Sequence, residues 1–479
     1  MEKIIGREHE IAILNDLLKS KSAELLAMYG RRRVGKTFLI YTYFKDHMAF
    51  ELTGVKNGSL KDQLQLFAIA LQKATKSSLA LKPPSNWIEA FDALSRYLTT
   101  LDPQKKWVVF LDELPWLSGR KSGFLPAFEH FWNTWASRQP NLLITVCGSA
   151  ASWMIQNITQ ATGGLHNRIT RKIVLKPFSL AESDLYLKSR GSKLDQYHVL
   201  QIYMAFGGIP HYLKAVGRDS SAAQVIDKTC FSKDGLLNYE FDTLYSSLFD
   251  HADNHIKMVR ALAANSKGLS RKQLIEFSGL PSGGTVSTAL DELEKSGFVN
   301  LTIPFGKASY DGIYRLIDEF SIFYLKFMDR HKTSVTRNWI NLSQSQSYAI
   351  WCGMAFESVC LKHIDKIKAA LKIKAGTEES VWRYVPSRGS KEKGAQIDLI
   401  IDRTDRIINL CEIKFYTTTF TIDKSYAEKL LQKKDVFVSK ANTKKTVFMT
   451  MITTFGVKEN DYYDEQIQQS ITMEALFRP

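Results

Sequence analysis

A glycine-rich segment near the start of the chain has the residue types and spacing that bind phosphate. Residues 30–37 read GRRRVGKT, after a short apolar run and before an apolar helix start. In this GxxxxGK[ST] pattern the glycines let backbone N–H groups face phosphate oxygens, and the helix start adds a favourable dipole. We expect Lys36 on the β and γ phosphates of ATP and the Thr37 hydroxyl on Mg²⁺. The predicted nucleotide-binding residues of this segment are Gly30, Arg31, Arg32, Arg33, Val34, Gly35, Lys36, Thr37 and Phe38.

Two carboxylates end a second apolar run. The segment KKWVVFLDELPWL, residues 105–117, reads as a buried parallel strand with Asp112 and Glu113 at its carboxyl end. Asp112 is expected to bind the nucleotide's Mg²⁺ through water, and Glu113 to act as the general base that polarises the attacking water. The alternative is a strand end with two solvated acids, which the phosphate loop disfavours.

A third apolar run, residues 141–150, ends in Ser149. Many AAA-like ATPases place a polar residue that senses the γ-phosphate at the position that Ser149 resembles. The alternative is a cap for the next helix, and the sequence does not separate the two. Arg168 is a candidate for the γ-phosphate, in cis or across a subunit boundary, against the alternative of a plain surface arginine.

A second group of residues suited to chemistry lies on two apolar runs near the C-terminus. Asp398 lies in AQIDLIID, and Glu412 and Lys414 lie in RIINLCEIKFY. Side chains alternate along a strand, so Glu412 and Lys414 share a face, and a hairpin centred on Asp405 places Asp398 opposite Glu412. Two close carboxylates form a hard-oxygen site for Mg²⁺, which activates water and stabilises the charge of a displaced phosphodiester. Lys414 would position that water or neutralise the developing charge.

Two flanking helices support this interpretation over a hairpin with ordinary cross-strand ion pairs. Glu357 lies on a helix expected over residues 351–371, at a position that resembles the further acid often carried by the first helix of restriction-endonuclease-like folds. The apolar stripe of that helix is Met354, Phe356, Val359, Leu361 and Ile364. A basic helix after the hairpin carries Lys429, Lys433 and Lys434, which are placed to touch a nucleic-acid backbone. A site that binds but no longer cleaves is the second interpretation.

The elements that must position these residues predict an α/β multidomain chain. We expect a P-loop ATPase core over residues 1–175, a helical lid over 176–250, a winged helix over 251–330 and a nuclease-like α/β domain over 331–479. From Pro177 the apolar residues recur at three-and-four spacing, which is typical of helices. The turn at residues 207–210, GGIP, either faces the nucleotide or simply joins two helices.

The predicted winged helix spans residues 255–318, with Ser270 as a helix cap and a wing centred on Gly306 and Lys307. Such a module places its second helix in the DNA major groove. The residues expected on phosphates are Lys267, Arg271, Lys272, Thr285, Ser287 and Lys307. The predicted recognition helix also carries Asp291, Glu292 and Glu294, which repel phosphate. Packing on the core, or binding a protein, is therefore the alternative.

Taken together, these motifs resemble prokaryotic AAA-like, STAND-related P-loop ATPases with a winged helix and a C-terminal domain of formerly unknown function. That domain is similar to restriction endonucleases, the PD-(D/E)xK superfamily. The resemblance covers nearly all 479 residues. The proline of the superfamily name is missing, since Gln396 and Ile397 precede Asp398. The resemblance implies ATP-driven action on nucleic acid, and it implies that IIGREHEIAIL, residues 4–14, packs on adenine.

Composition narrows the class of protein further. Lys and Arg number 64 and Asp and Glu 49, so the formal charge of +15 suits a polyanionic partner, DNA in the first place, although a generally basic surface gives the same count. Five scattered cysteines lack zinc spacing, which predicts reduced thiols in a cytoplasmic protein. No apolar run approaches the ~20 residues of a membrane-spanning helix.

The expected function is ATP hydrolysis coupled to a Mg²⁺-dependent nuclease-like domain. The alternative is a nucleotide-dependent switch or scaffold with an inactive nuclease fold, which binds DNA, another protein or a second copy of the chain.

Overall fold

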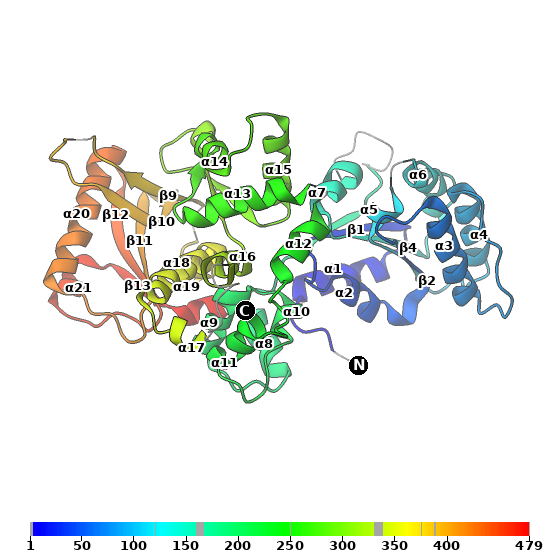
Figure 1. Ribbon diagram of the computed structural model, residues 1–479, viewed down its shortest axis with the longest axis horizontal. Coiled ribbons are helices and arrows are strands. Elements are labelled where there is room, and N and C mark those ends of the chain that lie inside the picture. Colours follow the sequence, from blue (N-terminus) through cyan, green and yellow to red (C-terminus); the bar gives the residue numbers. More distant parts are fainter. Residues whose placement is uncertain are drawn as a thin grey trace. The chain divides into compact units, whose positions relative to one another are not determined.

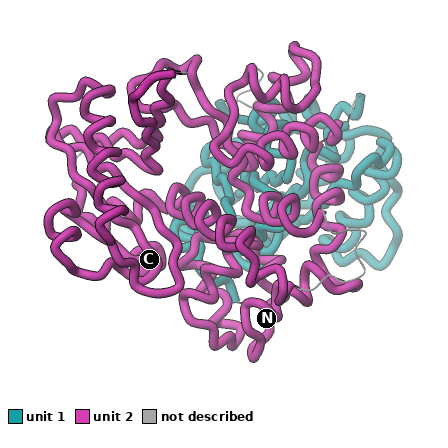
Figure 2. Tube along the Cα trace, turned by 60° about the vertical axis from the view of Figure 1, so that its left-hand side comes forward, with its two compact units in different colours: residues 1–177 teal, residues 178–479 magenta. Residues whose placement is uncertain are grey.

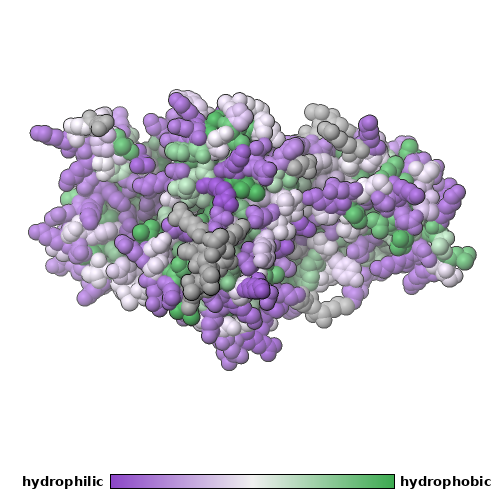
Figure 3. Space-filling model, viewed as in Figure 1, coloured by the Kyte–Doolittle hydropathy of each residue, from purple (hydrophilic) through white to green (hydrophobic). Residues whose placement is uncertain are grey.

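The computed structural model describes residues 3–119, 121–159, 167–249, 251–329, 339–374, 376–387 and 389–478. The chain divides into two compact units, residues 1–177 and residues 178–479, which Figure 2 distinguishes by colour. No helix in the part of the chain that the structure describes is long and apolar enough to cross a membrane. On the face shown in Figure 3, hydrophilic residues predominate and hydrophobic ones are scattered between them.

The first unit is built on a parallel sheet with the strand order β2-β3-β4-β1-β5 (Figure 1). Its strands are β1 (Glu24–Tyr29), β2 (Met48–Thr53), β3 (Trp107–Asp112), β4 (Leu142–Gly148) and β5 (Arg171–Val174). The continuous apolar runs of β1, β3 and β4 are almost wholly buried, as expected for strands covered on both faces. Parallel pairing brings the carboxyl ends of these strands to one edge of the sheet, where the phosphate loop, Glu113 and Ser149 follow them.

The helices of the first unit supply the apolar cover of this sheet. They are α1 (Glu8–Lys19), α2 (Lys36–Tyr43), α3 (Leu60–Thr75), α4 (Trp87–Thr99), α5 (Leu114–Leu117), α6 (Phe124–Thr134) and α7 (Ala151–Met154). An aromatic cluster joins α4 to α6, with Trp87 edge-on to Phe124 at 4.8 Å between ring centroids and Phe91 stacked on Phe131 at 5.0 Å. Helix α2 begins at Lys36, so the phosphate loop leads directly into a helix N-terminus.

The second unit begins with helices, as the three-and-four spacing predicts. They are α8 (Leu180–Ser189), α9 (Gln196–Phe206), α10 (Pro210–Leu213), α11 (Ala222–Ile226) and α12 (Glu240–Leu248). The predicted glycine turn joins α9 to α10, and Gly207 has a φ of 64°. A Cβ on Gly208 would lie 1.8 Å from the carbonyl oxygen of Phe178. These contacts give the glycines a packing role in a helix–helix turn, and a role facing nucleotide stays a prediction.

Three helices and a small antiparallel sheet follow. They are α13 (Ala252–Ala264), α14 (Arg271–Ser278) and α15 (Gly284–Lys295), with strands β6 (Leu269–Ser270), β7 (Val299–Thr302) and β8 (Ile313–Leu316) in the order β6-β8-β7. Ser270 caps α14 as predicted, because its hydroxyl accepts the N–H of Gln273. Helices α16 (Glu319–Phe323) and α17 (Trp339–Leu342) lead to the C-terminal sheet.

The C-terminal part is a mixed sheet in the order β13-β12-β11-β10-β9. Its elements are α18 (Gln346–Lys362), α19 (Ile364–Ala370), β9 (Thr377–Tyr384), β10 (Ala395–Arg403), β11 (Ile407–Lys414), α20 (Lys424–Ala441), β12 (Thr446–Thr453), α21 (Asp461–Gln466) and β13 (Gln469–Thr472). Strands β9, β10 and β11 are antiparallel, and β12 and β13 continue parallel to β11. Leu399 lies opposite Cys411, which confirms the predicted hairpin register centred on Asp405.

The single helix predicted over residues 351–371 is wrong. The chain turns at His363, whose Nε2 accepts the backbone N–H of Leu180 at 3.0 Å, so α18 and α19 are separate helices. The buried face of α18 is also shifted from the predicted stripe. Its buried residues are Trp351, Cys352, Ala355, Phe356, Val359 and Cys360. The two cysteines behave as small apolar side chains, and all five cysteines of the chain are free and buried.

Candidate functional site

The phosphate loop folds around its own lysine. Lys36 is 6 % exposed, and its ammonium donates to the carbonyl oxygens of Gly30 at 3.0 Å and Arg31 at 2.8 Å. Gly35 and Arg33 have positive φ angles of 93° and 67°, so the loop makes the tight turns that turn successive N–H groups to one side. The ammonium is thus held beside the backbone N–H groups that the motif predicts will bind phosphate. Phe38, the last predicted residue of the loop, is 41 % exposed at the start of α2.

Arg7, which precedes α1, braces the phosphate loop. The sequence pattern does not predict this contact. Its guanidinium is 5 % exposed, and it donates to the carbonyl oxygens of Val34 at 3.1 Å and Lys176 at 2.7 Å. The segment IIGRE was interpreted as an adenine contact only. Arg7 lies among Glu8, His9 and Glu10, so nothing in the sequence marks it as the side chain that braces the loop.

Thr37 and Asp112 lie together, as the motifs predict for a shared cation. The Thr37 hydroxyl donates to Asp112 Oδ2 at 2.7 Å, and the other carboxylate oxygen accepts the N–H of Glu113 at 2.9 Å. Asp112 is 4 % exposed. A hydroxyl and a carboxylate oxygen this close are hard-oxygen ligands of the kind that suit Mg²⁺. The donor set therefore fits the expected ion.

Glu113 and Ser149 are bonded to each other across the ends of β3 and β4. The Ser149 hydroxyl lies 2.9 Å and 2.8 Å from the two carboxylate oxygens of Glu113, and its N–H donates at 3.2 Å. Glu113 has a left-handed φ of 49°. The interpretation of Ser149 as a helix cap is wrong, because α7 has Ala150 in the cap position and no side-chain cap bond. Arg168 is exposed, which agrees with a surface arginine.

In the C-terminal sheet, Glu412 is the most heavily paired carboxylate. It is 2 % exposed and lies 2.8 Å from the Lys414 ammonium and 2.6 Å from the Lys433 ammonium. The Tyr426 hydroxyl donates to it at 3.0 Å. Burial works against ionisation, but the two lysines together hold the pKa of Glu412 below its ordinary value. Both Tyr426 and Lys433 come from α20, so the face of β11 that carries Glu412 is covered by that helix.

Asp398 has the opposite electrostatic environment. Burial, with the charges of Glu412 and Glu357, raises the pKa of Asp398 to about 7. Its Oδ2 accepts the backbone N–H of Ile413 on β11 at 3.0 Å. The pairing of β10 with β9 shifts register between Ile397 and Ile400, and such a bulge re-aims the side chain inside it. Carboxyl groups whose pKa values are pushed apart are typical of paired acid and base sites.

Glu357 reaches this site from α18, and it brings a partner that the sequence did not suggest. Its carboxylate lies 3.1 Å from the Arg315 guanidinium on β8. The charge of Glu357 also acts on this site, because it raises the pKa of both Asp398 and Lys414. Within the described residues, no set of three or more His, Cys, Asp or Glu side chains gathers as a metal site. Asp398 and Glu412 therefore offer a two-carboxylate donor pair.

The segment between β7 and β8, which the sequence predicts as a wing, packs against the C-terminal sheet. The Phe305 N–H donates to the carbonyl oxygen of Val381 on the edge strand β9 at 2.9 Å, and its ring lies 5.4 Å from that of Phe437 on α20. The residues predicted on phosphates are all exposed. They are Lys267, Arg271, Lys272, Thr285, Ser287 and Lys307.

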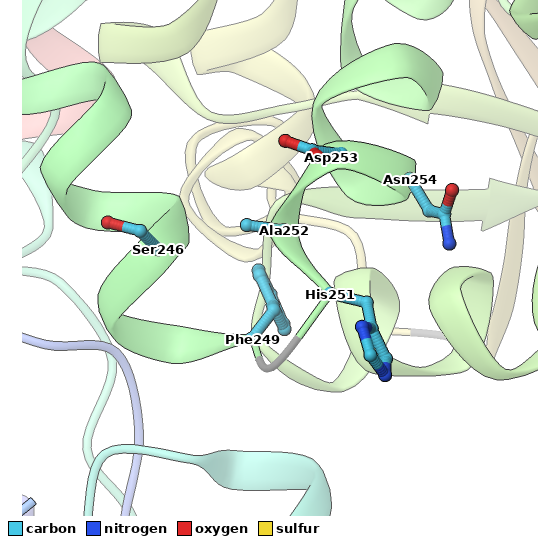
Figure 4. A pocket seen from close by; sticks show the side chains of 6 residues that line it. All are labelled: Ser246, Phe249, His251, Ala252, Asp253 and Asn254. Atoms are coloured by element: carbon cyan, nitrogen blue, oxygen red, sulfur yellow. The ribbon is translucent and has the colours of Figure 1, made fainter.

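Two of the acids on α15 have basic partners. Lys295 lies 2.7 Å from Asp291, and His255 lies 2.7 Å from Glu292. The ion pair with Lys295 weakens the repulsion of phosphate by Asp291. A shallow hollow lies beside the start of α13 (Figure 4). It is lined by Ser246, Phe249, His251, Ala252, Asp253 and Asn254 and contains none of the predicted site residues.

Comparison with known proteins bears on the first of these sites. Residues 4–216 match a family described as an ATPase domain predominantly from Archaea. An uncharacterised protein of Methanocaldococcus jannaschii is 22% identical over 415 residues, covering 86% of this chain and 87% of that protein.

Among solved structures, a Walker-type ATPase of Pyrococcus abyssi is similar with a TM-score of 0.50 and 20% identity, covering 67% of this chain and 96% of that one. The ORC2 protein of Aeropyrum pernix, solved with ADPNP and ADP, has a TM-score of 0.43 and 15% identity, covering 66% of this chain and 91% of that one. The family match, the fold likeness and the loop geometry agree: residues 4–216 carry a P-loop ATPase domain.

Proposed function

We propose that this protein couples ATP hydrolysis to metal-dependent cleavage of nucleic acid at its C-terminal sheet. In the ATPase domain Thr37 and Asp112 would hold Mg²⁺, which offsets phosphate charge when bound. On nucleotide binding, the Lys36 ammonium exchanges the loop carbonyls for the phosphates. Glu113 takes a proton from the attacking water, and Ser149 orients the Glu113 carboxylate. The support is the Thr37–Asp112 and Ser149–Glu113 hydrogen bonds at 2.7 Å and 2.8 Å, at adjacent strand ends beside the phosphate loop.

Two substitutions test the ATPase roles in the full-length protein. Lys36→Ala should abolish ATP binding measured by calorimetry. Glu113→Gln should bind ATP with unchanged affinity but lose at least ~100-fold in hydrolysis rate, because a general base contributes about that factor. If both variants hydrolyse ATP like the wild type, the assignment of this site is wrong.

The C-terminal half of the proposal is carried by one observation, the placement of Asp398 and Glu412 on paired strands with opposed pKa shifts and lysines beside them. Asp398 and Glu412 would hold a divalent cation, which supplies an activated water when bound. Lys414 and Lys433 then face the phosphodiester instead of Glu412, and they neutralise the negative charge that develops on it.

Plasmid nicking with Mg²⁺ or Mn²⁺ tests this half. We expect cleavage by the wild type and none by Asp398→Ala or Glu412→Gln, with Lys440→Met as a control on the far part of α20. Equal nicking by Asp398→Ala and the wild type would show that any cleavage comes from elsewhere.

A second function has support from the same geometry. Glu412 is bonded by two lysines and a tyrosine, an arrangement that also stabilises a site without metal. The protein would then be a nucleotide-dependent switch that binds nucleic acid or a protein partner without cutting it. Calorimetry separates the two: Mn²⁺ binding that requires Glu412 favours the nuclease, and its absence favours the switch.

A further inference from the structure

Arg315 links the winged-helix sheet to the C-terminal site. It lies on β8, the central strand of the small sheet, opposite Asn300 on β7. Its guanidinium reaches outside that sheet to the Glu357 carboxylate on α18 at 3.1 Å. The two side chains are only 14% and 22% exposed, so solvent and salt screen the pair less than they screen a surface ion pair.

The wing fixes this arrangement from a second direction. Phe305 bonds to Val381 of β9 and packs on Phe437 of α20, ten residues before Arg315 in the chain. Strand β8 is therefore tied both to the edge of the C-terminal sheet and to the helix that carries Glu357. The backbone that carries Arg315 is therefore anchored by the pairing of β8 with β7 and by the contacts of Phe305, and its side chain is directed to Glu357.

We propose that Arg315 is a positioning residue of the C-terminal site: it holds Glu357 and provides a positive charge that receives a nucleic-acid phosphodiester beside Asp398 and Glu412. The inference rests on the proposed nuclease-like function. The site then contains three carboxyl groups, Glu357, Asp398 and Glu412, and three cations, Lys414, Lys433 and Arg315. Removing Arg315 makes the net charge of the site more negative by one unit, which favours a divalent cation and disfavours a phosphate.

The experiment measures these two affinities separately in the full-length protein. Mn²⁺ binding is followed by calorimetry, and binding of a labelled DNA duplex by fluorescence anisotropy without divalent ions. For Arg315→Ala we expect about fivefold tighter Mn²⁺ binding and about fivefold weaker DNA binding, from one unit charge acting across a partly screened site. A merely structural role would weaken both.

Two further variants keep the test decisive. Arg315→Lys keeps the charge and should return both affinities to within about twofold of wild type. It also removes the buried Nε–H of Arg315, which has no partner among the described residues, so the variant is expected to fold. The matched control is Arg260→Ala. Arg260 forms an ion pair with Asp329 elsewhere in the same unit, with Nη2 3.1 Å from Oδ1. Neither affinity should change.

The outcomes separate this inference from the proposed function. If the wild type binds Mn²⁺, and Asp398→Asn abolishes that binding, the metal site stands. Unchanged or jointly weakened affinities in Arg315→Ala then overturn the role of Arg315 alone. A wild-type protein that binds no Mn²⁺ overturns both.

Discussion

Replacing Lys433 with methionine should destabilise the protein in the absence of metal and strengthen its binding of metal. Lys433 makes a 2.6 Å contact with Glu412, a carboxylate that is 2 % exposed, and the lysine itself is 24% exposed. Breaking a buried pair typically costs about 3–5 kcal/mol. Glu412 keeps Lys414 and Tyr426, however, so the loss is closer to one charged hydrogen bond, about 2 kcal/mol.

The same change removes a competitor for the metal. A divalent cation must displace Lys433 from Glu412, and the repulsion between the lysine and the ion disappears in Lys433→Met. We expect at least about tenfold tighter Mn²⁺ binding. The doubly charged ion and the singly charged ammonium repel each other at contact distance by several kcal/mol, even at an effective dielectric constant of about 20. Mn²⁺ at about 100 times its dissociation constant would raise the free energy of unfolding by about 2.7 kcal/mol, which offsets the stability lost with Lys433.

Thermal unfolding of the full chain, with EDTA and with Mn²⁺, measures both effects. The transition that includes the second unit should fall by about 4 °C in EDTA and recover in Mn²⁺. Lys440→Met is the matched control, because Lys440 lies on the same helix and pairs with the half-exposed Glu392 at 2.7 Å. Solvent screens that exposed pair, so Lys440→Met should leave the transition nearly unchanged, with no effect of Mn²⁺. Weaker Mn²⁺ binding in Lys433→Met than in wild type would refute the reasoning.

Other consequences follow from single contacts. Because the pKa of Asp398 is raised to about 7, the stability that its protonation provides is complete below about pH 4 and is lost as pH rises through 7. The melting temperature of Asp398→Asn should therefore be higher than that of the wild type at pH 8 and equal to it at pH 4. Arg7→Ala should weaken ATP binding about tenfold by calorimetry. The control, Lys106→Met, removes another buried cation that donates to carbonyls, here of Ser22 and Pro140, and should leave ATP affinity unchanged. Ser149→Ala should leave ATP affinity within about twofold but slow single-turnover hydrolysis at least about tenfold, because Glu113 loses its hydroxyl partner.

The features that sequence predicted well depend on short stretches of chain. The phosphate loop requires only that a strand, a glycine turn and a helix follow one another, and Thr37 and Asp112 meet because parallel strands share an edge. The hairpin register follows from the spacing of Asp398 and Glu412 about Asp405. Local backbone rules are sufficient for each of these.

The features that sequence missed depend on contacts between distant segments. His363 ends α18 by bonding to Leu180, and neither residue signals the other. The buried face of α18 differs from the predicted stripe because Trp351, Cys352 and Cys360 are buried, whereas that stripe includes none of them. Nothing in the sequence around Arg315 points to Glu357, since only the packed unit brings the two side chains together.

The wing also changes how nucleic-acid contact by the second unit should be understood. An open edge strand exposes unpaired backbone groups and invites pairing with another chain. Phe305 covers part of the β9 edge by bonding to Val381, so the wing has a structural partner within its own chain. A wing held there is not free to enter a groove of DNA as an independent module. Among the residues predicted on phosphates, Arg271 and Ser287 lie on α14 and α15, away from this contact; Arg271 donates to Ser287 at 3.0 Å and both are exposed. Strand β8 also carries Arg315, which contacts Glu357. The packing of the unit would therefore fix the position of a nucleic acid bound at these helices relative to Asp398 and Glu412.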